Sequence, residues 1–412
     1  MTEDGIRRTQ LDGGLSVLSH PVQGVRSASV GIWVRYGSAH EGPSERGVAH
    51  LLEHMVFKGT ERRSAREIAL VLERLGGSLD AYTSREHTSF QARVLDEHLD
   101  TAVDVVTDLV ASPLLRASDL ELEREVVLEE LATVEDTPDD LVFELHTEAL
   151  WPGHSYGHSI LGTRDTLGAL TAEDLRRLHE AAYRRPSLVV AATGAVDHDR
   201  LVDAVGARLA GLPNGAGPSP VAEAPPAEAG ERRVERDGAQ SHIVLGTQTV
   251  PHSDETRFPL ILLSSALGGG MSSRLFQRVR EDLGLAYAVY TFQSFYGAGG
   301  SLGVYVGTRP EWADRAVEVI REELSAVARE GLRAEELADA KGQVKGQMVL
   351  GMESPGGRLY RLALQELYGE PYRTVDELTA RIDAVDMNEI REVARRYLEP
   401  EGWLTVRLGP AH

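Results

Sequence analysis

The chain has 412 residues, of which 42% are hydrophobic and 26% charged, as in an ordinary soluble protein of two or three domains. Its net charge of −21 argues against nucleic acid and anionic membranes as partners, because both would repel it. It has no cysteine, which excludes a disulfide framework and leaves histidine and carboxylate side chains to hold any metal.

The start of the chain and its apolar segments predict its location. Residues 1–5 lack the basic start and apolar core of a signal peptide. No apolar run reaches the length that spans a bilayer. We therefore expect a cytoplasmic protein with no membrane partner.

The first elements lead into a helix with two histidines. Residues 15–20 and 27–36 alternate in the way of half-buried strands, and a turn-rich segment from residue 37 to 47 follows. The helix contains His50-Leu51-Leu52-Glu53-His54. Residues four apart share a helix face, so His50 and His54 can bind one cation from the same side with Glu53 beside it.

This arrangement is what a zinc-activated water requires: neutral imidazole ligands, an open metal position and an adjacent base. The order His-x-x-Glu-His is the inverse of His-Glu-x-x-His and is the inverzincin signature. A chance occurrence of the three residues is the alternative at this point.

The rest of the first half alternates helices with a strand pair. The predicted segments are helix 64–75, strands 78–83 and 88–94, helices 98–111, 117–135, 138–149 and 172–182, and strand 187–193.

The acidic helix at 117–135 offers the third zinc ligand. Glu123, Val127, Glu130 and Val134 fall on one stripe, whereas the other glutamates fall on a more polar face. We choose Glu130 as the ligand, with Glu123 two turns earlier supporting a ligating histidine. The alternative is a solvated acidic helix without a metal.

The second half resembles a weak copy of the first. Residues 211–230 are rich in Pro, Gly and Ala and predict an extended linker between a catalytic domain (1–210) and a homologous domain without metal ligands (231–412). Strands without strict alternation with helices indicate an α+β fold, in which each domain packs a mostly antiparallel sheet with helices.

Four sets of motifs follow one another along the chain: His50–Thr60 with Glu130, Asp80–Thr88, Tyr156-Gly157 with Leu161–Thr163, and Gly268–Leu275. In this order they resemble the pitrilysin and insulin-degrading-enzyme family of inverzincin metallopeptidases, most of all its bacterial members similar to the mitochondrial processing peptidase.

The resemblance implies one Zn²⁺ per chain on His50, His54 and Glu130, with Glu53 as general base and Glu123 as the supporting acid. It also implies that Arg280 and Tyr287 match the pair that faces the zinc from the opposing half of a clamshell. For a chain of this length, that half is a second copy, so a homodimer with composite active sites is expected.

The implied function is a zinc-dependent endopeptidase that hydrolyses unfolded peptides or short polypeptides by a zinc-bound water. The expected substrate-binding residues are Leu79, Asp80, Ala81, Tyr82 and Thr83 in a strand, and Gly268, Gly269 and Gly270 in a glycine-rich segment. The alternatives are a non-catalytic assembly or scaffold subunit of the same fold and a structural metal, although a closed zinc site generally needs a fourth ligand, which is not evident.

Overall fold

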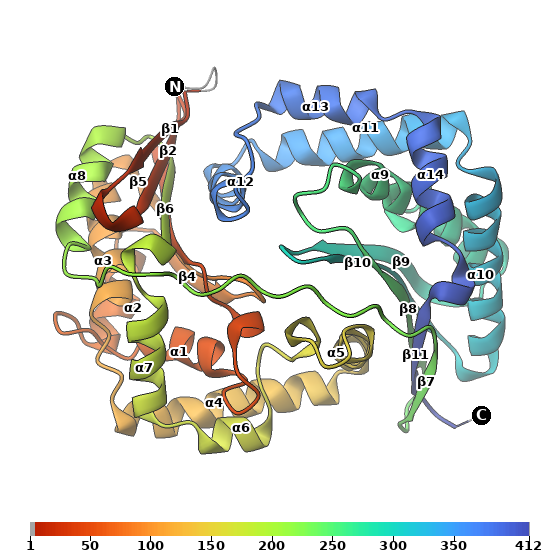
Figure 1. The fold of residues 1–412 in the computed structure, drawn as a ribbon, viewed down its shortest axis with the longest axis horizontal. Coiled ribbons are helices and arrows are strands. Elements are labelled where there is room, and N and C mark those ends of the chain that lie inside the picture. The colour runs from red at the N-terminus through yellow and green to blue at the C-terminus, as the bar shows by residue number, and fades with distance from the viewer. Residues whose placement is uncertain (1–4, 412) are drawn as a thin grey trace. The chain divides into compact units, whose positions relative to one another are not determined.

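Figure 1 shows a computed structural model that describes residues 5–411. Its first sheet has six strands in the order β1-β2-β6-β3-β5-β4. Only the β2–β6 pair is parallel. The strands are β1 Arg7–Gln10, β2 Ser16–Pro21, β3 Ser27–Val34, β4 Ser78–Thr83, β5 Thr88–Leu95 and β6 Leu188–Gly194. Strand β1 is not among the predicted strands. Most of the segment used to exclude a signal peptide lies outside the described residues.

The second sheet repeats this plan with five strands in the order β7-β11-β8-β10-β9. They are β7 Gly230–Glu235, β8 Ser241–Thr249, β9 Ala286–Phe295, β10 Gly300–Thr308 and β11 Leu404–Gly409. Its first and last strands pair in parallel, as β2 and β6 do, and the other pairs are antiparallel. The predicted α+β fold with two similar, mostly antiparallel sheets is confirmed.

Fourteen helices accompany the sheets in residues 5–411. The chain divides into two compact units, each with one of the sheets. The unit with the first sheet contains α1 Val48–Val56, α2 Ala65–Glu73, α3 Leu99–Ala111, most of α4 Ala117–Asp136, α6 Arg164–Ala169, α7 Ala172–Ala182, α8 His198–Arg208 and α12 Pro355–Leu367. The second holds α5 Pro138–Leu150, α9 Arg257–Gly268, α10 Ala313–Glu330, most of α11 Ala334–Gly351, α13 Val375–Ala384 and α14 Met387–Tyr397. None of the described helices has the length and apolar character needed to cross a bilayer.

The two compact units are not the contiguous halves expected from the linker. One contains the described residues up to Leu131 together with 158–221 and 350–374, and the other contains 132–157, 222–349 and the rest. Thus α5 packs on β8 and β11, whereas α12 packs on β2, β3 and β6. The reason is burial: Leu359, Leu362 and Ala363 of α12 cover a sheet face that includes the fully buried Trp33.

The opposite face of the first sheet carries the helix with the two histidines. Apolar residues of α1 (Val48, Leu51, Leu52, Met55 and Val56) are buried in the core with those of α3 and α7. Hydrophobic burial therefore fixes one side of α1, and the side chains on its other side are held at set positions.

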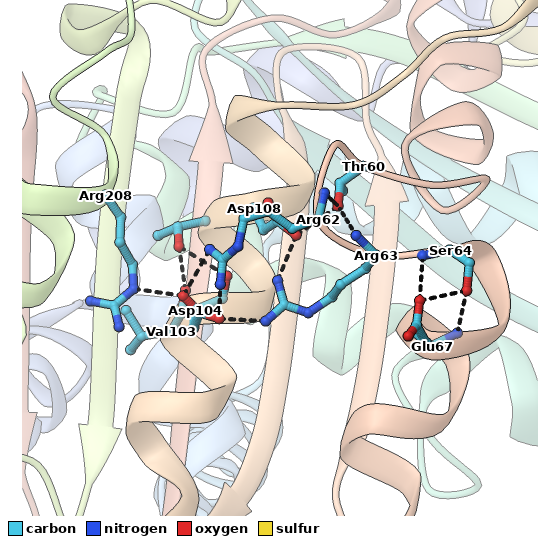
Figure 2. Close-up of polar contacts among 10 residues, drawn as sticks. Thr60, Arg62, Arg63, Ser64, Glu67, Val103, Asp104, Asp108 and Arg208 are labelled. Carbon is cyan, nitrogen blue, oxygen red and sulfur yellow. Dashed lines mark hydrogen bonds and ion pairs between the residues drawn. The ribbon is translucent and has the colours of Figure 1, made fainter.

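The loop after α1 is fastened to α3 by a group of ion pairs (Figure 2). Asp104 on α3 accepts hydrogen bonds from Arg62, Arg63 and Arg208, and Asp108 accepts from Thr60 at 2.7 Å and from Arg63 at 2.5 Å. Because Asp104 and Asp108 lie one turn apart, they bind the loop at two adjacent points. The residues that follow α1 are thereby anchored to the core.

Candidate metal centre

The start of α1 is capped by a carboxylate that sequence analysis missed. Glu41, only 5% exposed, accepts hydrogen bonds at 2.8 Å from the backbone N–H groups of Gly47 and Ala49. A carboxyl group there satisfies two of the N–H groups that a helix leaves unpaired at its start, and burial raises its pKa to about 8. Gly47 has a φ of +88°, and an added Cβ would lie 2.6 Å from the carbonyl oxygen of Leu161. The helix therefore begins at a defined place and angle.

The two histidines and Glu130 converge as the sequence predicted. The rings of His50 and His54 have centroids 4.7 Å apart, and each Nε2 atom lies 3.6 Å from a different oxygen of Glu130. One donor atom from each residue falls within 4.8 Å of the others. Within residues 5–411 these three make the one group of histidine and carboxylate side chains so arranged. Helix α4 supplies Glu130 from the stripe that also buries Val127.

Glu123 lies behind His54, on the same face of α4. Its Oε2 atom is 3.2 Å from Nδ1 of His54, and its Oε1 atom pairs with Lys58. A carboxylate at Nδ1 favours the tautomer in which Nδ1 carries the proton and the Nε2 lone pair remains free. Lys58 is a contact that the sequence analysis did not predict.

The group suits zinc chemically. Burial lowers the pKa of His50 to about 4, and the neighbouring His54 acts in the same direction, so His50 is the neutral imidazole that a metal requires. Its Nδ1 atom is buried with no hydrogen-bond partner among the described residues. Two imidazoles and one carboxylate are a set known from catalytic zinc sites with three protein ligands.

Glu53 lies between the histidines and is 9% exposed. Its Oε2 atom accepts a hydrogen bond of 2.6 Å from the Thr83 hydroxyl, at the end of β4. Burial raises the pKa of Glu53, and the hydrogen bond from Thr83 and the nearby His54 offset only part of that effect. A buried carboxyl group with a raised pKa suits a general base.

The expected substrate-binding strand is β4, one of the two edge strands of its sheet. Leu79 and Ala81 pack against the core on the α1 side. On the other face, the Tyr82 hydroxyl lies 3.5 Å from the indole nitrogen of Trp33. Of the five predicted residues, Thr83 alone is hydrogen-bonded to Glu53 among the described contacts.

The second unit brings Arg280 and Tyr287 together. The guanidinium carbon of Arg280 lies 5.3 Å from the centre of the Tyr287 ring, and Tyr287 is 78% exposed.

The predicted glycine segment, residues 268–270, lies at the end of α9. A Cβ on Gly268 would lie 2.5 Å from the backbone nitrogen of Thr291, and the side chain of Gln343 donates a hydrogen bond of 2.8 Å to the Gly269 carbonyl. The shape of this segment thus depends on glycine and on α11.

Comparison with known proteins gives matches along nearly the whole chain. Residues 16–164 match the family described as insulinase (peptidase family M16), and residues 169–344 match the family described as the peptidase M16 inactive domain. An uncharacterized zinc protease of Streptomyces coelicolor is 41% identical over 98% of this chain and 90% of its own length. One from Bacillus subtilis is 36% identical over 95% of each chain.

Solved structures share the fold. A protease from Helicobacter pylori superposes with a TM-score of 0.93 at 22% identity, covering 98% of this chain and 99% of its own. The structure of a peptidase M16 inactive domain from Pseudomonas fluorescens also superposes with a TM-score of 0.93, at 20% identity. The superposition covers 99% of this chain and 98% of that structure.

Proposed function

The chain belongs to the insulinase family of peptidases, family M16, and we propose that it is a zinc-dependent endopeptidase acting on unfolded peptides or short polypeptides. The observation that carries this proposal is the convergence of His50, His54 and Glu130 within 4.8 Å, with Glu53 on the same helix. The relatives named zinc proteases support the metal and the reaction class.

Zinc would be held by the two Nε2 atoms and by the Glu130 carboxylate. When bound, it supplies a Lewis acid that lowers the pKa of a water molecule and polarises the carbonyl group of the scissile peptide bond. The part of Glu53 is to take a proton from the attacking water and pass it to the leaving amine. Glu123 holds His54 in its ligating orientation.

We propose that Arg280 and Tyr287 act on the substrate bound to a second copy of the chain. An exposed tyrosine next to a guanidinium can donate a hydrogen bond to the oxyanion that develops at the carbonyl. The partner would therefore be another copy of the same chain, in a homodimer with two composite sites.

The substrate is proposed to bind as an added strand. Because β4 ends its sheet, its outer backbone groups have no neighbouring strand among the described residues. A peptide paired there is recognised mainly through its backbone, with a loose side-chain preference, and the glycine segment 268–270 is proposed to give further backbone contacts. An extended peptide fits this mode, whereas a folded protein does not.

The competing function is a non-catalytic assembly subunit of the same fold. The site does not favour this function, because an assembly subunit does not require these features together. They are a neutral His50, a His54 in contact with Glu123, and a buried Glu53 beside them.

Metal analysis with a quenched fluorogenic peptide assay tests the proposal. We expect about one zinc per chain, cleavage within the peptide, loss of cleavage with a chelator and recovery when zinc is restored. A zinc-loaded chain that cleaves no member of a varied peptide library would refute the peptidase and favour the assembly subunit.

A further inference from the structure

We propose that Thr83 positions the Glu53 carboxylate, and that the reaction requires the hydroxyl of this residue as well as its place in the substrate-binding strand. The inference rests on the proposed function of Glu53 as the base. It adds a residue of β4 that positions the base, whereas the base itself and the proposed zinc ligands lie on α1 and α4.

The contact between the two side chains is short and directional. Oγ1 of Thr83 lies 2.6 Å from Oε2 of Glu53, within the range for a hydroxyl that donates to an ionised carboxylate. The hydroxyl donates and Glu53 accepts, so the bond fixes the position of one carboxylate oxygen. No other side chain in residues 5–411 donates a hydrogen bond to this carboxylate.

The sheet sets the direction of the Thr83 side chain. Alternate residues of a strand share a face, and Leu79 and Ala81 of β4 pack into the core on the side of α1. Thr83 continues this face at the end of the strand, where it pairs with Thr88 of β5. Its β-branched side chain has few rotamers, which limits the directions in which the hydroxyl can point.

Glu53 needs such a restraint. Its terminal torsion is broad, and a carboxylate free to rotate would spend much of its time in orientations unsuited to proton transfer. With Oε2 held by the Thr83 hydroxyl, the carboxylate has fewer orientations available around its terminal torsion. The strand that would bind the substrate is thus also the strand that orients the base.

Three variants separate the hydroxyl from the strand. Thr83→Val keeps the shape and the backbone but removes the donor, Thr83→Ser keeps the donor, and Thr88→Val removes a neighbouring hydroxyl that donates to the Tyr36 carbonyl at 2.9 Å. We expect Thr83→Val to lower kcat about 10- to 100-fold with little change in KM and with zinc content unchanged. Thr83→Ser should stay within about threefold of the native kcat, and Thr88→Val should affect thermal stability without such a loss of kcat.

Crystal structures of the same variants provide a readout that does not depend on activity. Glu53 should occupy one conformation in the native chain and in Thr83→Ser, and several in Thr83→Val. If Thr83→Val does not fold, Thr83→Ala replaces it. A native chain that binds zinc but cleaves no peptide would refute the proposed function, while the structures still test the positioning. Native kcat in the hydroxyl-free variant, a loss seen only in KM or zinc content, no rescue by serine, or an unchanged single Glu53 conformer would overturn the inference.

Discussion

Nδ1 of His54 lies 3.2 Å from the carboxylate of Glu123, which is 5% exposed and also pairs with Lys58. The carboxylate thus joins the helix with the histidines to the loop that follows it. Lys58 offsets the charge of this buried carboxylate, and the contact with Nδ1 leaves the Nε2 atom of His54 free.

Replacing Glu123 with glutamine should weaken zinc binding about 10- to 100-fold, because the amide is a poorer acceptor for the Nδ1–H group and loses the pair with Lys58. Competition with a chromogenic chelator measures the affinity. Glu121→Gln, on an exposed position of the same helix, is the matched control and should leave the affinity unchanged. Equal affinities for the two variants would contradict a supporting role for Glu123.

Replacing Glu53 with glutamine should abolish turnover while zinc content stays near the native level. The amide has nearly the same shape but cannot accept a proton, and general-base catalysis contributes about 10²- to 10⁴-fold to such rates. Steady-state cleavage of the fluorogenic peptide and metal analysis on the same preparation provide both numbers. Appreciable residual activity in a zinc-loaded sample would refute Glu53 as the base.

Helical periodicity predicted the convergence of the metal-site side chains. The spacing of His50 and His54 and the stripe that joins Glu123 to Glu130 are properties of single helices, which a sequence shows directly. Lys58, Glu41 and the bond from Thr83 were not foreseen. Each of these contacts depends on how a loop or strand end packs against another element. The periodicity of hydrophobic residues in the sequence gives no information about such packing.

The fold shows the same division. Local sequence patterns predicted five of the six strands of the first sheet, and the resemblance between the two halves predicted a second, similar sheet. The placement of α12 could not be predicted, since Leu359, Leu362 and Ala363 form an apolar stripe that suits any exposed sheet face. Tertiary packing decides which sheet this stripe covers. Because α12 follows the linker in the sequence, we expected it in the second domain, whereas it packs on the first sheet.

The stability of the first unit should depend on pH through Asp104. Burial alone would raise the pKa of Asp104, but hydrogen bonds from Arg62, Arg63 and Arg208 outweigh it, and the pKa is lowered (Figure 2). A carboxyl group with a lowered folded-state pKa stabilises the fold above its unfolded value, about 3.9, and loses that contribution as the pH falls towards the folded value.

Asp104→Asn should therefore lower the free energy of unfolding by about 1–3 kcal/mol at pH 7, since three guanidinium groups lose their anion. The difference in the free energy of unfolding between the variant and the native chain should stay constant between about pH 6 and 8 and become smaller below about pH 4. Denaturant unfolding at several pH values measures it, with Asp203→Asn at an exposed position of α8 as the control. A stability difference that grows as the pH falls would contradict a lowered pKa of Asp104 in the folded state.

The composite site can be tested with two inactive variants. Glu53→Gln removes the base from the first unit, and Tyr287→Phe removes the donor from the second, where it should lower kcat by about 10²-fold and affect KM less. When the two chains are co-expressed with different tags and purified through both, one site of each mixed dimer carries both changes and the other carries neither. We expect about half of the native activity per dimer, because one of its two sites is intact.

Mixed dimers of Glu53→Gln and Glu130→Gln are the decisive control. Both changes lie in the same unit, so every site in that dimer keeps one defect and no activity should return. If Tyr287 served the site of its own chain, the first pair would stay inactive as well, because each chain would still carry its own defect. Recovery in the first pair alone therefore assigns Tyr287 to the neighbouring copy, and two tagged chains that do not co-purify would argue against the dimer itself.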